Sequence, residues 1–261
     1  MTFPDSPRVI YSHNPLETVI CQLRFPPILK IDAEIPASFQ ELIRHEYPLF
    51  TDRLPDNEGL EIPPEIAKLM SIGLQFQGGK RKYEFSTSDE LWQVTLTRDF
   101  LALTTKKYER WEDFKRHLDG PVDALLSQYG PDFYVRIGLR YRNLIKRSQL
   151  EVKDCSWSEL LQPHVAGELA SEIHGFIRKA GRELLIELEG KIGHVKIKHG
   201  IINAKDSSED FYLIDADFYT DQQTEIGHAI SRLDRFNKEA GHLFRWCITD
   251  RLHSAMGPRS I

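Results

Sequence analysis

Three arginines in one segment are the residues of this chain best suited to chemistry. Positions 133–146 read FYVRIGLRYRNLIK, a nearly regular alternation of apolar and polar residues. A strand of period two would place on one face Arg136, Arg140, Arg142, Tyr134 and Gly138. Guanidinium groups match phosphate oxygens, an aromatic ring beside them could stack a base, and glycine permits close approach. We therefore expect these five residues to form a ligand- or partner-binding surface.

Acidic residues on other predicted strands offer the arginines a structural role instead. Glu187 and Glu189 flank Leu188, and Asp215 and Asp217 flank Ala216. If either strand lies beside the arginine strand, cross-strand charge pairs would satisfy the guanidinium groups without a ligand. Segment 131–153 nevertheless carries six basic residues against two acidic ones, in a chain of net charge -5. The concentration of positive charge is therefore local, and both interpretations stay open.

The same acidic pairs define a catalytic alternative. Carboxylates two residues apart on a strand lie about 7 Å from each other, a spacing that could hold a divalent metal ion. With facing arginines, Asp215 and Asp217 would suit a metal-dependent enzyme acting on nucleic acid or a nucleotide. No nuclease-type acidic signature, phosphate-binding glycine loop, zinc-protease motif or serine-hydrolase motif accompanies them. We therefore assign no catalytic residue, and we expect no metal and no cofactor.

Composition sets broad limits on the class of protein. The chain has 261 residues, of which 41% are hydrophobic and 28% charged, as in an ordinary globular protein. Its acidic balance argues against a generic nucleic-acid or membrane-surface coat. The sequence shows no secretory signal and no apolar run of spanning length. Three widely spaced cysteines, Cys21, Cys155 and Cys247, are typical of reduced thiols, so we expect a cytoplasmic protein.

The remaining periodicity predicts an α+β fold of antiparallel sheets covered by two long helices. Beyond the arginine strand, we expect strands at 17–25, 72–76, 82–86, 91–97, 100–106, 173–178, 183–189, 193–200 and 211–219. We expect helices at 36–47, 110–129 and 224–256, the second kinked or split at Gly120–Pro121, and a short helix capped by Ser156. Residues 51–68 should form a long surface connection.

The order of these elements suggests two parts, 1–150 and 151–261, each a set of strands followed by a long helix. The alternatives are a duplicated fold and one continuous domain. A final helix of about 33 residues would be roughly 50 Å long. Because such a helix would overhang a small sheet, Phe236 and Trp246 near the edge of its apolar face suggest a homodimer or partner contact.

Three segments lie near the start, middle and end of the chain: NPLETVICQLRFP (14–26), RIGLRYRN (136–143) and FNKEAGHLFRWCITD (236–250). Together they resemble a family of uncharacterised, sporadically distributed prokaryotic proteins. The resemblance implies a prokaryotic cytoplasmic protein of a mobile or defence-type locus, such as toxin–antitoxin or phage-defence genes. It implies no particular activity, because none is established for the family, and the defence-type locus is inferred by analogy alone.

Taken together, the sequence favours a non-catalytic binding or accessory protein with a regulatory role. We expect it to bind a protein partner, a second copy or a phosphate-containing ligand such as a nucleotide or nucleic acid, and no membrane. The metal-dependent enzyme is the alternative. A third interpretation is a small-molecule cavity between a curved sheet and the long helix, which a sequence cannot reveal.

Overall fold

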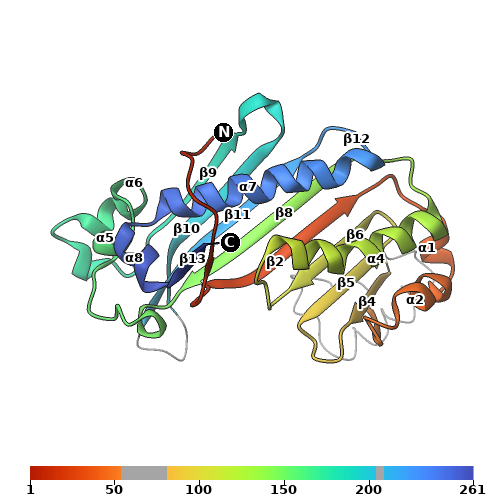
Figure 1. Cartoon of the computed structure of the whole chain (residues 1–261), viewed down its shortest axis with the longest axis horizontal. Helices are drawn as coiled ribbons and strands as arrows, with labels where there is room; N and C mark the ends of the chain where they lie inside the picture. Colours follow the sequence, from red (N-terminus) through yellow and green to blue (C-terminus); the bar gives the residue numbers. More distant parts are fainter. Residues whose placement is uncertain (54–80, 204–208, 261) are drawn as a thin grey trace, which may run out of the picture.

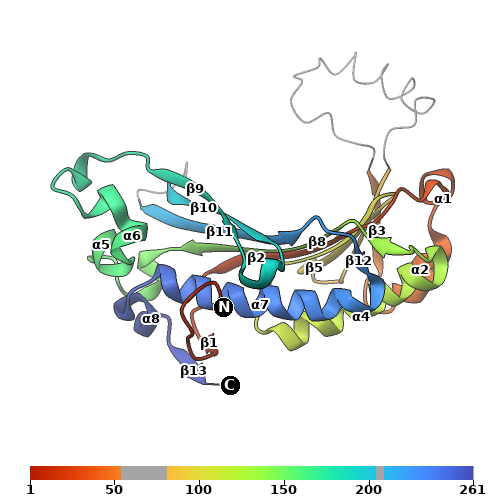
Figure 2. The same cartoon turned by 90° about the horizontal axis from the view of Figure 1, so that it is seen from above.

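A nine-stranded antiparallel sheet forms the centre of the protein, with its strands in the order β3-β4-β5-β6-β2-β8-β11-β10-β9. The computed structural model describes residues 1–53, 81–203 and 209–260. Two long helices, α4 (Trp111–Tyr129) and α7 (Ala229–Cys247), lie on the same face of the sheet (Figures 1 and 2). The predicted α+β architecture is confirmed.

The strands of the sheet are longest at its middle. Their bounds are β2 Leu16–Arg24, β3 Leu49–Arg53, β4 Lys82–Ser86, β5 Trp92–Thr97, β6 Phe100–Thr105, β8 Arg136–Ile145, β9 Gly181–Glu187, β10 His194–Asn203 and β11 Asp210–Thr220. Two short ribbons add β1 (Val9–Tyr11) with β13 (Pro258–Ser260), and β7 (Phe133–Tyr134) with β12 (Thr224–Glu225). Shorter helices are α1 Leu29–Ala33, α2 Ala37–Ile43, α5 Trp157–Leu160, α6 Pro163–Ala166 and α8 Asp250–Ala255.

Most of the described elements fall into two series of similar order, with four strands in the first meander and three in the second. The first series is β2, helices α1 and α2, the meander β3 to β6, and α4. The second is β8, helices α5 and α6, the meander β9 to β11, and α7. The strands β2 and β8 pair with each other at the middle of the sheet, and each also pairs with the last strand of its own meander. The arginine strand β8 therefore opens the second series and joins both series into one continuous sheet.

The predicted single helix over 224–256 is wrong. Thr224–Glu225 belongs to β12, α7 ends at Cys247, and α8 begins at Asp250. Ile248 between the helices is extended and fully buried, and it forms a β-bridge with Leu161. The Thr249 hydroxyl caps the N-terminus of α8. The helix breaks here because the backbone groups on either side of Ile248 bond outside the helix: Cys247 C=O accepts from Gln162 N–H, and Thr249 N–H donates to Leu160.

The helix break removes the overhang on which the predicted interface depended. Phe236 is fully buried and packs on Phe218, with a ring-centroid distance of 6.3 Å. Trp246 is partly buried against Phe3, at 5.6 Å. Phe236 therefore belongs to the core, and Trp246 helps to hold α7 against Phe3. A homodimer or partner contact stays a prediction.

The structure confirms some of the other predicted helices, strands and caps and contradicts others. Of the two outcomes predicted at Gly120–Pro121, the split is wrong, since α4 continues through Pro121 and ends before Gly130, which has φ +49°, and the kink stays a prediction. The predicted strand at 173–178 is a single 3₁₀ turn, and both Ile173 and Phe176 are exposed there. The cap at Ser156 is confirmed as a capping box with Glu159. The strand predicted at 72–76 and most of the connection at 51–68 lie outside the described residues, and residues 51–53 of that connection belong to β3.

Candidate functional site

Strand β8 divides its side chains between two environments. Ile137, Leu139 and Tyr141 are buried on the side that faces the helices. Arg136, Arg140 and Arg142 alternate with these residues and so lie on the other side of the sheet, as their spacing predicts. Figure 2 shows α4 and α7 on one side of the sheet only. The alternation between the two faces does not extend back to Tyr134 in β7. Tyr134 is fully buried and pairs with Thr224 in the β7–β12 ribbon, so it does not stand beside the arginines, and its predicted stacking role is wrong.

Each of the three arginines has an acidic partner within the sheet. Asp215 and Asp217 lie on β11, directly beside β8. Arg140 donates two hydrogen bonds to Asp215, with Nε 2.7 Å from Oδ1. Arg136 Nη2 lies 2.8 Å from Asp217 Oδ2, and its guanidinium group stacks 4.9 Å from the ring centre of Tyr219. Arg142 Nε lies 3.2 Å from Glu17 on β2.

Gly138 does provide close approach, but to a side chain of its own strand. A Cβ atom at this position would lie 2.4 Å from Nη1 of Arg136. The missing side chain lets the Arg136 guanidinium cross β8, so that Nη1 donates to Gln22 on β2 (3.1 Å) while Nη2 reaches Asp217 on β11. The glycine is therefore explained by packing within the sheet.

The acidic pairs fall in different places. Asp215 and Asp217 join the arginines, whereas Glu187 lies on β9 at the far edge of the sheet and Glu189 contacts the amino terminus. Burial raises the pKa of Asp217, and the neighbouring arginines only partly oppose this. Among the described residues, no group of three or more His, Cys, Asp or Glu side chains could hold a metal ion. The Asp215 and Asp217 carboxylates accept hydrogen bonds from arginines instead.

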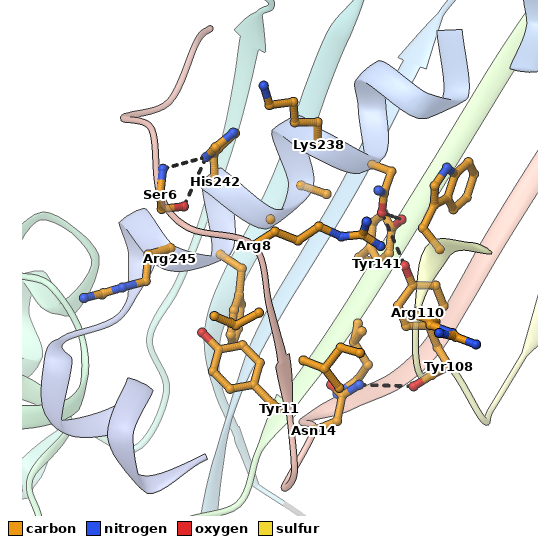
Figure 3. Close-up of a pocket in the computed structure, with 18 of the residues that line it drawn as sticks. Ser6, Arg8, Tyr11, Asn14, Tyr108, Arg110, Tyr141, Lys238, His242 and Arg245 are labelled. Atoms are coloured by element: carbon orange, nitrogen blue, oxygen red, sulfur yellow. Dashed lines mark hydrogen bonds between the residues drawn. The ribbon is translucent and has the colours of Figure 1, made fainter. Parts of the chain in front are cut away.

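A cavity of about 490 Å³ lies on the opposite, helix-covered side of β8. Its walls come from α7, from the segment that enters α4, from β8, and from the first residues of the chain (Figure 3). We call residues 1–13 the N-terminal strap. Its Ser6 backbone N–H donates to His242 Nδ1 on α7 (3.1 Å), and β1 within it pairs with β13. The strap thus closes one side of a space between the sheet and the last long helix.

An amide and two phenols are linked at one side of this cavity. Tyr141 of β8 donates to Asn237 Oδ1 at 2.8 Å, and Tyr108 donates to the same oxygen at 3.3 Å. Their rings meet edge-on, with centroids 5.7 Å apart. Because both phenols use the amide oxygen, the Asn237 amide nitrogen keeps its two hydrogens for another partner, and no described residue accepts them.

The same phenols are poor acid–base groups. Burial raises the pKa of Tyr108 to about 12 and raises that of Tyr141 well above its ordinary value. Both therefore stay protonated near neutral pH, and they act as hydrogen-bond donors and not as bases. This chemistry suits recognition of a ligand better than its conversion.

Arg8 of the strap supplies a cation to the cavity. Its side chain crosses the space toward Tyr141 (Figure 3), and Nη2 donates to Glu112 of α4 at 2.7 Å. That hydrogen bond lowers the pKa of Glu112 to about 2. The bond to Glu112 occupies Nη2 alone, and a guanidinium group carries five N–H donors, so Arg8 can still donate to an anion.

The sequence raised a cavity between sheet and helix as an alternative, but it named none of these residues. Arg8, Tyr108, Tyr141 and Asn237 are far apart along the chain, and the strap has no periodic pattern. Asn237 carries no motif, and Tyr141 looks like any core residue of a strand. Only the folded chain brings them together.

Comparison with known proteins adds no assignment: no family model matches the chain, and no curated protein matches it. Within the described parts of the chain, no helix is long and apolar enough to cross a bilayer.

Proposed function

We propose that this chain is a non-catalytic binding protein whose ligand occupies the cavity beneath the N-terminal strap. The observation that carries the proposal is the unused pair of N–H donors on Asn237, held beside two aromatic rings in a space of about 490 Å³. Natural ligand sites are concave, span about 300–1,000 Å³, and place a few polar groups among aromatic ones. The cavity meets each of these conditions.

The lining favours a phosphate-bearing ligand with a planar heteroaromatic ring, such as a nucleotide. Side-chain amides pair with the edges of bases, and tyrosine rings stack on base faces. Arg8, from the strap, would then hold the phosphate, since a guanidinium fork matches phosphate oxygens. The three cysteines are free and buried, which supports a reducing compartment, and we place the protein in the cytoplasm. An accessory role in a mobile or defence-type locus stays an expectation from the family resemblance.

The test begins with protein purified gently at low salt. Native mass spectrometry and the ratio of absorbance at 260 and 280 nm should reveal a bound nucleotide-like ligand, and calorimetry with a nucleotide panel should measure its affinity. Asn237→Asp keeps an oxygen for the two phenols but removes the N–H donors, so affinity should fall roughly ten- to a hundredfold. Arg8→Ala should weaken binding of phosphate-bearing ligands more than that of nucleosides.

Arg142→Ala is the matched control, because it removes an arginine from the open face of the sheet and leaves the cavity intact. Its affinity should equal that of the wild type. Loss of binding in this control, with Asn237→Asp unaffected, would move the site to the arginine face. A ligand-free protein that binds no nucleotide in the panel would overturn the proposal.

A further inference from the structure

The outer edge of the sheet at β9 is exposed, and an apolar run lies at its middle between Glu183 and Glu187. Figure 1 shows β9 at one margin of the sheet, and among the described strands it pairs only with β10. Leu184 is 39% exposed and Leu185 63% exposed, on opposite faces of the strand. Edge strands are normally protected by proline, lysine, a bulge or a covering element. The run Leu184–Leu185–Ile186 in β9 has no such protection.

The backbone of β9 also presents unused hydrogen-bonding groups at this edge. Leu188 N–H donates to Gly193, and Ile201 N–H donates to Ala180, which fixes the alternation of the β9–β10 ladder. Even-numbered residues therefore bond β10, and the N–H and C=O groups of the odd-numbered residues point outward. Those residues are Gly181, Glu183, Leu185 and Glu187.

The charges on β9 favour one register in which the β9 strands of two copies could pair. A two-fold axis perpendicular to the sheet would keep the helices of both copies on one side and oppose residues of the same face. An axis through Glu183 or Glu187 would set that carboxylate against its own copy, and an axis through Leu185 would set Glu183 against Glu187. An axis through Leu184 pairs the whole strand and opposes no like charges.

We propose that two copies of this chain join through antiparallel pairing of β9 about Leu184, which makes one continuous sheet across the dimer. Leu184 then faces its own copy, and Glu183 faces Leu185. Glu183 is already paired with Lys196 (2.8 Å) and Lys198 (3.3 Å) of β10, so its charge is compensated. Gly181 faces Glu187, which brings the turn after β9 of one copy toward the segment before β9 of the other. Exposed Ile173 and Phe176 lie in that segment.

The test measures the mass of the full chain by light scattering and native mass spectrometry over a concentration series. The wild type should be a dimer. Leu185→Pro should be a monomer, because it removes an outward N–H and no bond to β10. Leu184→Lys should also raise the dimer dissociation constant at least roughly tenfold, since two lysines would meet at the axis. Leu42→Lys, at an exposed leucine of α2, is the control and should stay dimeric.

A charge-swap pair tests the register. Leu184→Glu should be monomeric like Leu184→Lys, and an equimolar mixture of the two should form a heterodimer, because residue 184 meets residue 184 only in this register. Recovery of the heterodimer also shows that both variants are folded. A monomeric wild type, a dimer that Leu185→Pro leaves intact, or a mixture that fails to associate would each overturn the proposal.

Discussion

The two faces of β8 carry polar side chains from the same short stretch of chain, yet they use them differently. On the open face, each arginine is paired with a carboxylate of a neighbouring strand. Arg136 and Arg140 pair with β11, and Arg142 pairs with β2. On the helix side, Tyr141 contributes to a network that leaves the donors of Asn237 unused. The guanidinium groups are therefore paired within the sheet, while the Asn237 amide keeps two N–H donors for which no described residue is the acceptor.

A basic segment in a sheet does not by itself show that its face is free to bind a ligand. Adjacent strands place side chains of one face within reach of each other, so a basic strand beside an acidic strand compensates itself. A cavity needs segments that do not pack flat on each other. Here the strap and the entry to α4 leave such a space beside α7.

Among substitutions on the two faces of β8, one in the buried core should change the free energy of unfolding most. Leu139→Ala removes a fully buried side chain on the helix side of β8 and should lower the free energy of unfolding by about 2–5 kcal/mol. Urea unfolding followed by circular dichroism measures this. A loss under about 1 kcal/mol would mean that the two faces of β8 do not differ in burial as described.

Arg140→Ala should have a smaller effect on the free energy of unfolding, about 1–3 kcal/mol. The Asp215 side chain is 8% exposed, so it would lose its two charge-assisted hydrogen bonds where water can only partly replace them. The loss stays moderate because the arginine itself is 45% exposed.

Arg142→Ala is the internal control for this prediction. Its side chain and that of Glu17 are both 44–45% exposed, and such surface pairs contribute about 0–1 kcal/mol. Equal losses for the two variants, measured by urea unfolding, would contradict the ion-pair geometry of the open face.

The smallest expected effect is on how the free energy of unfolding depends on pH. The folded-state pKa of Glu112, about 2, lies below the ordinary value of 4.5 because Arg8 donates a hydrogen bond to it. The stability from this pair is therefore present above pH 4.5 and is lost as pH falls toward 2. Asp217 has the opposite sign, since its raised pKa favours the folded state at low pH.

Arg8→Ala should flatten the fall in unfolding free energy between pH 4.5 and pH 2. The change should stay below about 1 kcal/mol, because both partners are 50% exposed and solvent screens the pair. Urea unfolding at several pH values measures the slope, and 1 M salt should shrink the difference between variant and wild type. A slope unchanged by the substitution would show that Arg8 does not hold Glu112 in solution.

Period-two patterns were sufficient for the strands that carry a buried face, such as β2, β6 and β11, because one face of each must be apolar. The strand predicted at 173–178 had no such support, since IHGFIR carries its apolar residues at 173, 176 and 177, and the chain forms a 3₁₀ turn there. The helical period over 224–256 did not reveal where the helix ends. Ile248 fits that period, but it is also the kind of apolar residue that can form an extended, buried β-bridge. Short ribbons such as β1–β13 join the two ends of the chain and have no local signal.

By itself the sequence determined the α+β class, the helix α4 and the side of β8 on which the arginines stand, since each of these follows from local periodicity. Only the tertiary structure decided that Asp215 and Asp217, and not Glu187 and Glu189, lie beside the arginines, because strand order depends on packing of the whole sheet. It also decided that Tyr134 is buried, and that Arg8, Tyr108, Tyr141 and Asn237 share a cavity. Residues this distant in sequence meet through the packing of α7 and the strap, and no local pattern encodes that contact.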